Sequence, residues 1–300
     1  MQSYEKMEEE EEKRFYNLKL SLKVFFSNKT AVAGLVIFLM YVADALLMQF
    51  YPEALGIRNP NVLTYNFVNP VPQPPSPQYP LGTTYPGVNL LQAILEAIRV
   101  DLGFSLIIVI SGAVIGAVIG ILAAYVGGYF DEILMRVTDI FFSIPYLVLA
   151  LAAGFVLGRS LSSMVIALII VWWPIYARYS RSLTLSLKES TFIEAAKASG
   201  ANNLRIMFKH ILPNTLPPIL VQISLDLGSV VGIFATLAFI GFIPNANIPE
   251  LGYLTSLGLN YIQSAPWTVI FPGAAITLFA LSVNLMGDGL RDVIDPRRRS

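Results

Sequence analysis

The sequence contains no cysteine and a single histidine, His210. Disulfides and thiolate metal sites are therefore excluded, although the redox compartment stays open. One histidine cannot form a cluster with metal-ligand spacing, and no nucleophile with a matching base can be recognised along the chain. We predict no catalytic residues and no metal site, so the chain is not expected to be an enzyme.

Charge is also scarce, because only 13% of the 300 residues are charged and 20 acidic residues balance 20 basic ones. A net charge of zero gives no reason to expect a nucleic acid partner. The sequence also lacks the Gly-x4-Gly-Lys-Ser/Thr loop that cradles phosphates in many ATP-binding proteins. The chain is therefore expected to hold no cofactor, and any ATP and Mg²⁺ that serve it would be bound by partner subunits.

Apolar residues dominate what is present. They make up 55% of the chain, and the mean hydropathy of +0.63 is too high for a soluble domain of this length. A helix needs about 20 apolar residues to cross the roughly 30 Å hydrocarbon core of a bilayer. Six blocks meet this requirement: residues 31–50, 104–126, 140–158, 160–177, 215–243 and 264–287. The predicted fold is all-α, a polytopic membrane protein with six transmembrane helices in the lipid bilayer.

The distribution of positive charge predicts the orientation, because cytoplasmic loops are enriched in lysine and arginine. With the N-terminus inside, all 20 of these residues except Arg58, Arg99 and Arg159 fall in cytoplasmic segments. Both termini are therefore expected in the cytoplasm. The first apolar block begins too late and is too long for a cleaved signal peptide, and we expect a retained helix.

The long segment after the first span divides into two parts. Prolines between Asn69 and Pro80 make the first part irregular, since proline lacks a backbone donor and restricts its neighbour. Leu90–Val100 restores a helical pattern, which predicts an amphipathic surface helix ahead of the second span. The predicted parts are a cytoplasmic tail (1–30), the first span (31–50), an extracellular loop with a surface helix (51–103), a membrane core (104–287) and a cytoplasmic tail (288–300).

Two features stand out inside the predicted spans. Gly112, Gly116 and Gly120 recur at intervals of four, which places them on one helix face where another helix can pack closely. Asp226 stands in an otherwise uncharged block, where an acid costs about 2.5–3.5 kcal/mol on insertion scales and usually faces protein or water. Asp226 is expected either to serve a polar pathway or gate, or to form a hydrogen bond that packs neighbouring helices.

The segment of residues 184–214 is long for a connection between spans, and its pattern is that of two short helices. Asn202 can cap a second helix over residues 204–211, which Pro213 is expected to end. Between the helices, Gly200 supplies the backbone conformation of a sharp turn. The first helix would cover residues 184–199, with an apolar side formed by Leu187, Phe192, Ala195 and Ala196.

A helix, a glycine turn and a second helix beneath a membrane would form a rigid projection. On pattern alone, the alternative is a capped surface loop that merely joins two spans. The choice between them depends on motifs in this segment and around it.

These motifs resemble one family. Within the segment they are Glu194-Ala195-Ala196, Gly200 and His210-Ile211-Leu212-Pro213-Asn214. Elsewhere they include Pro80-Leu81-Gly82-Thr83, Gly127-Gly128-Tyr129-Phe130-Asp131-Glu132, Trp173-Pro174, Ala265-Pro266-Trp267 and Gly287-Asp288-Gly289. In this order they resemble permease subunits of ABC importers, the binding-protein-dependent transport inner membrane components, in the DppC/OppC-like subfamily that handles dipeptides, oligopeptides and nickel.

The resemblance implies a type I importer permease with a MetI-like core, which forms half of a translocation pathway in a prokaryotic cell membrane. The implied partners are a second homologous permease subunit, two ABC ATPase subunits and an extracellular solute-binding protein. The segment 184–214 would be the EAA loop, which such permeases insert into a groove on the ATPase. The implied coupling residues are Glu194, Ala195, Ala196, Gly200, His210, Ile211, Leu212 and Pro213.

The sequence departs from the family pattern outside the loop. Tyr79, Thr84 and Gly87-Val88-Asn89 replace a motif that usually carries charges. The family often has glutamate near Ile233 and a small residue where Asp226 stands, so these two are the candidate pathway or gate positions. Peptides are the expected substrates, with oligosaccharides or nickel through the same machinery as alternatives. A stand-alone secondary transporter or channel is the alternative function.

Overall fold

The computed structural model describes residues 19–57, 59–242 and 248–294, and helices make up most of this part of the chain. The strands within it are β1 (Thr83–Thr84) and β2 (Val88–Asn89), which pair antiparallel with Thr83 opposite Asn89. The predicted all-α fold is therefore confirmed. The acidic run of the predicted N-terminal tail and the arginines at the end of the chain lie outside the described residues.

Among the described residues, five helices are long and apolar enough to cross a membrane. They are α2 (Lys29–Phe50), α3 (Leu90–Val126), α6 (Leu161–Lys188), a helix over Asn203–Phe239 that contains α8 (Asn203–Ile206) and α9 (Leu212–Phe239), and α11 (Trp267–Ile294). In the same part of the chain, a bent pair of helices would make a sixth span if the pair crosses the membrane as one.

The bent pair consists of α4 (Gly128–Ser143) and α5 (Tyr146–Leu157), which meet at 95°. The predicted span over residues 140–158 therefore lies across a break and is not one straight helix. Pro145 has no backbone N–H and forces Ile144 into an extended conformation, with φ −107° and ψ 131°. The helix ends there, and a new helix starts in another direction.

The second span is longer than predicted. We expected a separate surface helix over Leu90–Val100 and a membrane core from residue 104, but α3 runs without a break for 37 residues. Residues from other parts of the chain contact the polar side chains of this stretch. Arg99 donates to Gln49 Oε1 at 2.8 Å and to Asn61 Oδ1 at 2.6 Å, and Asp101 is only 2% exposed.

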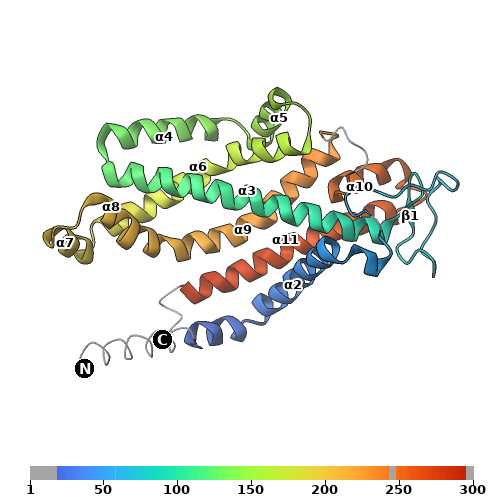
Figure 1. The fold of residues 1–300 in the computed structure, drawn as a ribbon, viewed down its shortest axis with the longest axis horizontal. Helices are drawn as coiled ribbons and strands as arrows, with labels where there is room; N and C mark the ends of the chain where they lie inside the picture. Colours follow the sequence, from blue (N-terminus) through green and yellow to red (C-terminus); the bar gives the residue numbers. More distant parts are fainter. Residues whose placement is uncertain (1–18, 58, 243–247, 295–300) are drawn as a thin grey trace.

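The long helices lie side by side along the bundle (Figure 1). α7 (Thr191–Ala198) and α8 lie at one end, and α10 (Leu251–Gly258) lies with β1 at the other; we call these the α7 end and the α10 end. The start of α2 and the last turn of α11 lie toward the α7 end, where Asn28 Nδ2 donates to Asp292 Oδ2 at 3.2 Å. The main core lies between α3, α6 and α9 and includes Ile108, Leu168, Val230 and Phe234.

α3 and α6 pack closely through the three glycines of the predicted stripe. A Cβ on Gly112 would lie 3.2 Å from Trp172 Cβ, and one on Gly116 would lie 2.6 Å from Tyr176 Cβ. A Cβ on Gly120 would lie 2.9 Å from Arg181 N and still closer to Ala177 O. No side chain fits between these backbones, so α3 and α6 are joined along much of their length.

The α10 end has a smaller core of its own. Leu63, Leu90, Leu251 and Leu254 are buried there. The motifs around Thr83 and Trp267, which are 184 residues apart, meet at this end, because Trp267 Nε1 donates to Thr83 O at 3.2 Å. Gly82 has φ +76°, and a Cβ there would collide with Gln73 O at 2.6 Å, so this position requires glycine.

Candidate functional site

The segment at the α7 end consists of two helices joined by a glycine turn, with bounds that differ from the prediction. Residues 184–188 still belong to α6, and Glu189 and Ser190 separate it from α7, so a single helix over 184–199 is wrong. Gly200 has φ +77°, and a Cβ there would meet no atom within 4 Å. The backbone conformation, and not a lack of space, requires glycine at this turn.

The second helix begins as predicted and ends far beyond the prediction. Asn202 Oδ1 accepts from Arg205 N at 2.8 Å, which caps α8. A π turn over Met207–Ile211 then continues directly into α9. Pro213 lies in the first turn of α9, after Leu212 N–H has donated five residues back to Met207 O. This wider turn accommodates the proline, so the prediction that Pro213 ends the helix is wrong.

This segment is fixed to α3 by a small core. Ile193, Ile206 and Ile211 are fully buried, and Ile121 of α3 packs with them. The predicted apolar side was partly wrong, because Phe192 and Ala195 are exposed while Ile193 is buried. The segment is therefore a packed unit with a defined orientation.

Three large apolar side chains of this unit are exposed. Phe192, Leu204 and Phe208 are 43%, 63% and 62% exposed. Several large apolar side chains exposed on one projecting unit are typical of a protein contact. Of the predicted coupling residues, Glu194, Ala195, Gly200 and Pro213 are exposed, Ala196, His210 and Leu212 are half-buried, and Ile211 is buried.

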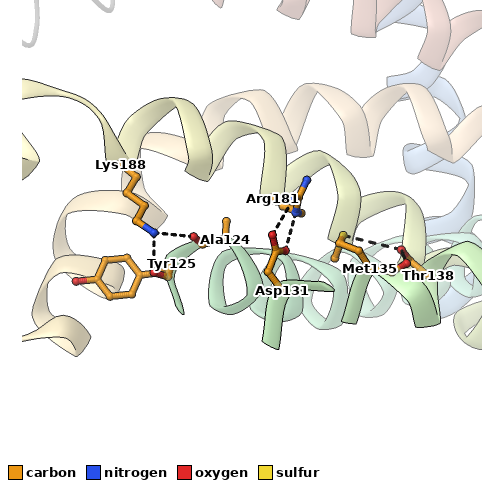
Figure 2. Close-up of polar contacts among 7 residues, drawn as sticks. All are labelled: Ala124, Tyr125, Asp131, Met135, Thr138, Arg181 and Lys188. Atoms are coloured by element: carbon orange, nitrogen blue, oxygen red, sulfur yellow. Dashed lines mark hydrogen bonds and ion pairs between the residues drawn. The ribbon is translucent and has the colours of Figure 1, made fainter. Parts of the chain in front are cut away.

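Charged side chains near this unit join α3, α4 and α6 to one another (Figure 2). Arg181 of α6 donates from Nε and Nη2 to the two carboxylate oxygens of Asp131 in α4, both at 2.6 Å. Lys188, at the end of α6, donates to Ala124 O at 3.2 Å and to Tyr125 O at 3.0 Å. These are carbonyls of the last turn of α3, where helices leave acceptors free and attract cations. We call Asp131, Arg181 and Lys188 the clamp, because together they join α3 and α4 to α6.

A second site lies midway along the bundle, beside the break between α4 and α5. A cavity of about 390 Å³ is lined there by residues of α4, α5, α6 and α9, among them Asp226, Ser229 and Ile233. The two predicted pathway positions, Asp226 and Ile233, therefore line one cavity. The wall opposite includes Phe142, Ile144 and Tyr146, which are exposed at the break.

Two residues that the sequence analysis did not single out hold Asp226 in place. Gln222 Nε2 donates to Asp226 Oδ1 at 2.9 Å, and Trp172 Nε1 donates to Asp226 Oδ2 at 3.3 Å. The spacing of four residues on one helix could have indicated Gln222. Trp172 lies on another helix, 54 residues away, and no local pattern pairs it with Asp226.

Comparison with known proteins assigns the chain to a family. The profile of the family described as binding-protein-dependent transport system inner membrane component matches residues 116–300. The chain belongs to this family. It is 38% identical, over 93% of its length and 90% of the relative's, to the dipeptide transport system permease protein DppC of Alkalihalophilus pseudofirmus. It is 37% identical, over 95% of its length and 93% of the relative's, to the probable D,D-dipeptide transport system permease protein DdpC of Escherichia coli.

The fold of this inner membrane component is also known from solved structures. A chain of the MetNI methionine ABC transporter in an inward-facing conformation superimposes with a TM-score of 0.58, over 69% of this chain and 98% of that one, at 20% identity. The expected MetI-like core is therefore confirmed as a fold. The chain is a permease component, as the family description and the relatives' names agree.

Proposed function

We propose that this chain is one of two homologous permease subunits of an ATP-driven importer of short peptides in a prokaryotic cell membrane. Two ATPase subunits would bind ATP and Mg²⁺, and an extracellular solute-binding protein would deliver the peptide. The observation that carries the proposal is the similarity to dipeptide permeases over more than nine-tenths of the chain. The chain itself would hold no cofactor and contact no nucleic acid.

The α7 end is the proposed contact with the ATPase. Its exposed apolar side chains, Phe192, Leu204 and Phe208, would enter a groove on the ATPase, and the exposed Glu194 would pair with a basic group there. Gly200 would set the angle between α7 and α8. His210, Ile211, Leu212 and Pro213 would connect this contact to α9, since the helix runs on without a break.

The clamp would make the coupling effective. A displacement of α7 would move α6, which precedes it in the chain. Lys188 would transmit this movement to α3, and Arg181 would transmit it to α4. α4 ends at the break that lines the Asp226 cavity. Closure of the ATPase would thus move the wall of that cavity, and Asp226 and Ile233 would lie on the translocation pathway.

The proposed orientation places both termini and the α7 end in the cytoplasm. The position of the start of α2 and the end of α11 toward the α7 end supports this, together with the charge distribution. Tags at both termini and at Ser199 should then report cytoplasm, and a tag near Asn69 should report the outside. A tag at Ser199 that reports the outside would refute the orientation.

Co-purification tests the coupling assignment. Gly200→Asp and Glu194→Lys should each reduce the ATPase recovered with the permease by about tenfold, as for the loss of a central contact. Gly56→Asp and Glu53→Lys are matched controls, because Gly56 has φ +74° with no atom near its Cβ position and Glu53 is exposed, both at the α10 end. Unchanged ATPase recovery in the Gly200 and Glu194 variants at normal expression would refute the assignment.

Reconstitution tests the substrate. The test uses proteoliposomes that hold both permeases and the ATPases, with the solute-binding protein outside. They should take up labelled dialanine only when ATP is present in the compartment that the ATPases face. Excess unlabelled dipeptide should compete, whereas maltotriose and Ni²⁺ should not. Uptake of sugar or nickel without uptake of dipeptide would reject the peptide assignment, and uptake by this chain alone on an ion gradient would reject the importer.

A further inference from the structure

The carboxylate of Asp226 is buried, and its neighbours are all neutral. It accepts from the amide of Gln222 and the indole of Trp172, and the phenol of Tyr176 lies nearby. Within the described residues no lysine or arginine forms an ion pair with it. A buried carboxylate is normally paired with a cation, because its transfer out of water is costly. The missing positive charge can come from a molecule that enters the cavity.

The walls of the cavity suit a positive charge as well. Phe141, Phe142, Tyr146 and Trp172 contribute aromatic rings, whose faces attract ammonium and guanidinium groups within about 6 Å. The protein uses one of these rings in this way, because Arg178 Cζ lies 4.2 Å from the centroid of Phe142. Arg178 is itself paired with Asp139, so it leaves the charge of Asp226 unbalanced.

The size and position of the cavity fit a transported solute. Its volume of about 390 Å³ lies within the range of about 300–1,000 Å³ that small-molecule sites occupy. Ser229 adds a hydroxyl on the same face of α9, one turn from Asp226. The cavity borders the exposed break between α4 and α5, so a solute can reach it without unfolding a helix.

We propose that this cavity is a transient binding site for the ammonium group of the transported solute, and that Asp226 is the residue that distinguishes a protonated amine from a neutral amide. The inference rests on the proposed function, in which this group is the free N-terminus of a short peptide. The carboxylate accepts hydrogen bonds from the ammonium while aromatic rings surround it. Because both contacts are local, the site selects the peptide's N-terminus and leaves its side chains unconstrained.

Binding to the assembled complex, without the solute-binding protein, tests the site directly. Millimolar dialanine should raise the melting temperature of the permease–ATPase complex, and N-acetyl-dialanine, which lacks the ammonium, should not. Asp226→Asn should abolish the shift and Asp226→Glu should retain it. Thr236→Ala, which changes an exposed residue of the same helix outside the cavity lining, should alter the shift little. Equal shifts with both dipeptides in the wild-type complex would overturn the proposal.

Uptake provides an independent measurement. Asp226→Asn should slow dialanine uptake by about tenfold, the effect of losing one charge-assisted hydrogen bond, while Asp226→Glu stays within a few-fold of wild type. Unchanged uptake in Asp226→Asn would refute the proposal. If that variant does not assemble, the melting-temperature shifts of the wild-type complex with dialanine and N-acetyl-dialanine still test the proposal. A wild-type importer that assembles but takes up no dipeptide would refute the proposed function, and the thermal shifts would still decide the role of Asp226.

Discussion

Each end of the bundle is stabilised by a different kind of polar contact. At the α7 end, side chains of opposite charge meet: Arg181 pairs with Asp131, and Lys188 binds the carbonyls at the end of α3. At the α10 end, acidic side chains are buried. Glu250 and Asp101 are 0% and 2% exposed, and their oxygens accept from the backbone N–H groups at the start of α10, those of Leu251, Gly252 and Tyr253.

The polar contacts at the α7 end can therefore be exchanged for others, whereas those at the α10 end cannot. The Arg181–Asp131 pair is partly exposed, with side chains 34% and 14% accessible, so each member can exchange its partner for water or another protein at small cost. The carboxyl groups at the α10 end have no such option, because an unpaired N–H at the start of a buried helix is costly. The α7 end is built for reversible contact, and the α10 end is built to stay fixed.

The largest effect is expected where α3 and α6 connect the two ends. Gly120→Ala places a methyl group against the backbone of Ala177 and Arg181, and should lower the free energy of unfolding by about 3 kcal/mol. Gly103→Ala in the same helix is the control, since a Cβ there meets no atom within 4 Å; it should raise stability by about 0.5–1 kcal/mol. Thermal unfolding in detergent measures both, and equal effects would contradict the close packing of α3 on α6.

The next largest effect should come from the α10 end. Glu250→Ala removes the acceptor of two buried N–H groups and should cost about 2 kcal/mol of unfolding free energy. Glu250→Gln keeps one carbonyl oxygen and should cost about half as much. If the two variants unfold at the same temperature, the cap does not hold α10 in place.

The same carboxyl group should make this end sensitive to pH. Burial raises the pKa of Glu250 from 4.5 to about 8. The two backbone hydrogen bonds that it accepts lower the pKa, but burial has the larger effect. Because the folded state holds the proton more tightly, the contribution of Glu250 to stability is complete below about pH 4.5 and is lost as pH rises through about 8. The melting temperature should fall over this range, and less steeply in Glu250→Gln.

The smallest effect on stability is expected at the α7 end. Arg181→Lys keeps the charge but cannot form the two parallel hydrogen bonds to Asp131, and should cost about 0.5–1 kcal/mol. A double-mutant cycle with Asp131→Asn isolates the pair and should give a coupling energy of the same size. A coupling energy of zero would remove the clamp from the proposed mechanism.

Sequence reasoning succeeded where the signal was local. Apolar blocks located the spans, and Asn202 and Gly200 marked the turn at the α7 end. It failed where distant residues decide the structure. The pattern of residues 90–100 predicted a separate surface helix, but α3 continues through them. Arg99 and Asp101 are contacted there by Asn61 and Leu251, from other parts of the chain. The partner of Asp226 on α6 and the contact between Thr83 and Trp267 likewise have no local sequence signature.

The length of α3 has a consequence for how the chain unfolds. Its 37 residues extend about 55 Å at about 1.5 Å per residue, whereas the hydrocarbon core is about 30 Å thick. The part of α3 that lies beyond the lipid belongs to the core around Leu90, Leu251 and Leu254. One continuous helix is therefore partly in lipid and partly outside it. Urea acts from the aqueous side, so it should melt the core at the α10 end while the part of α3 in the lipid stays helical, and a single helix would then belong to two cooperative units.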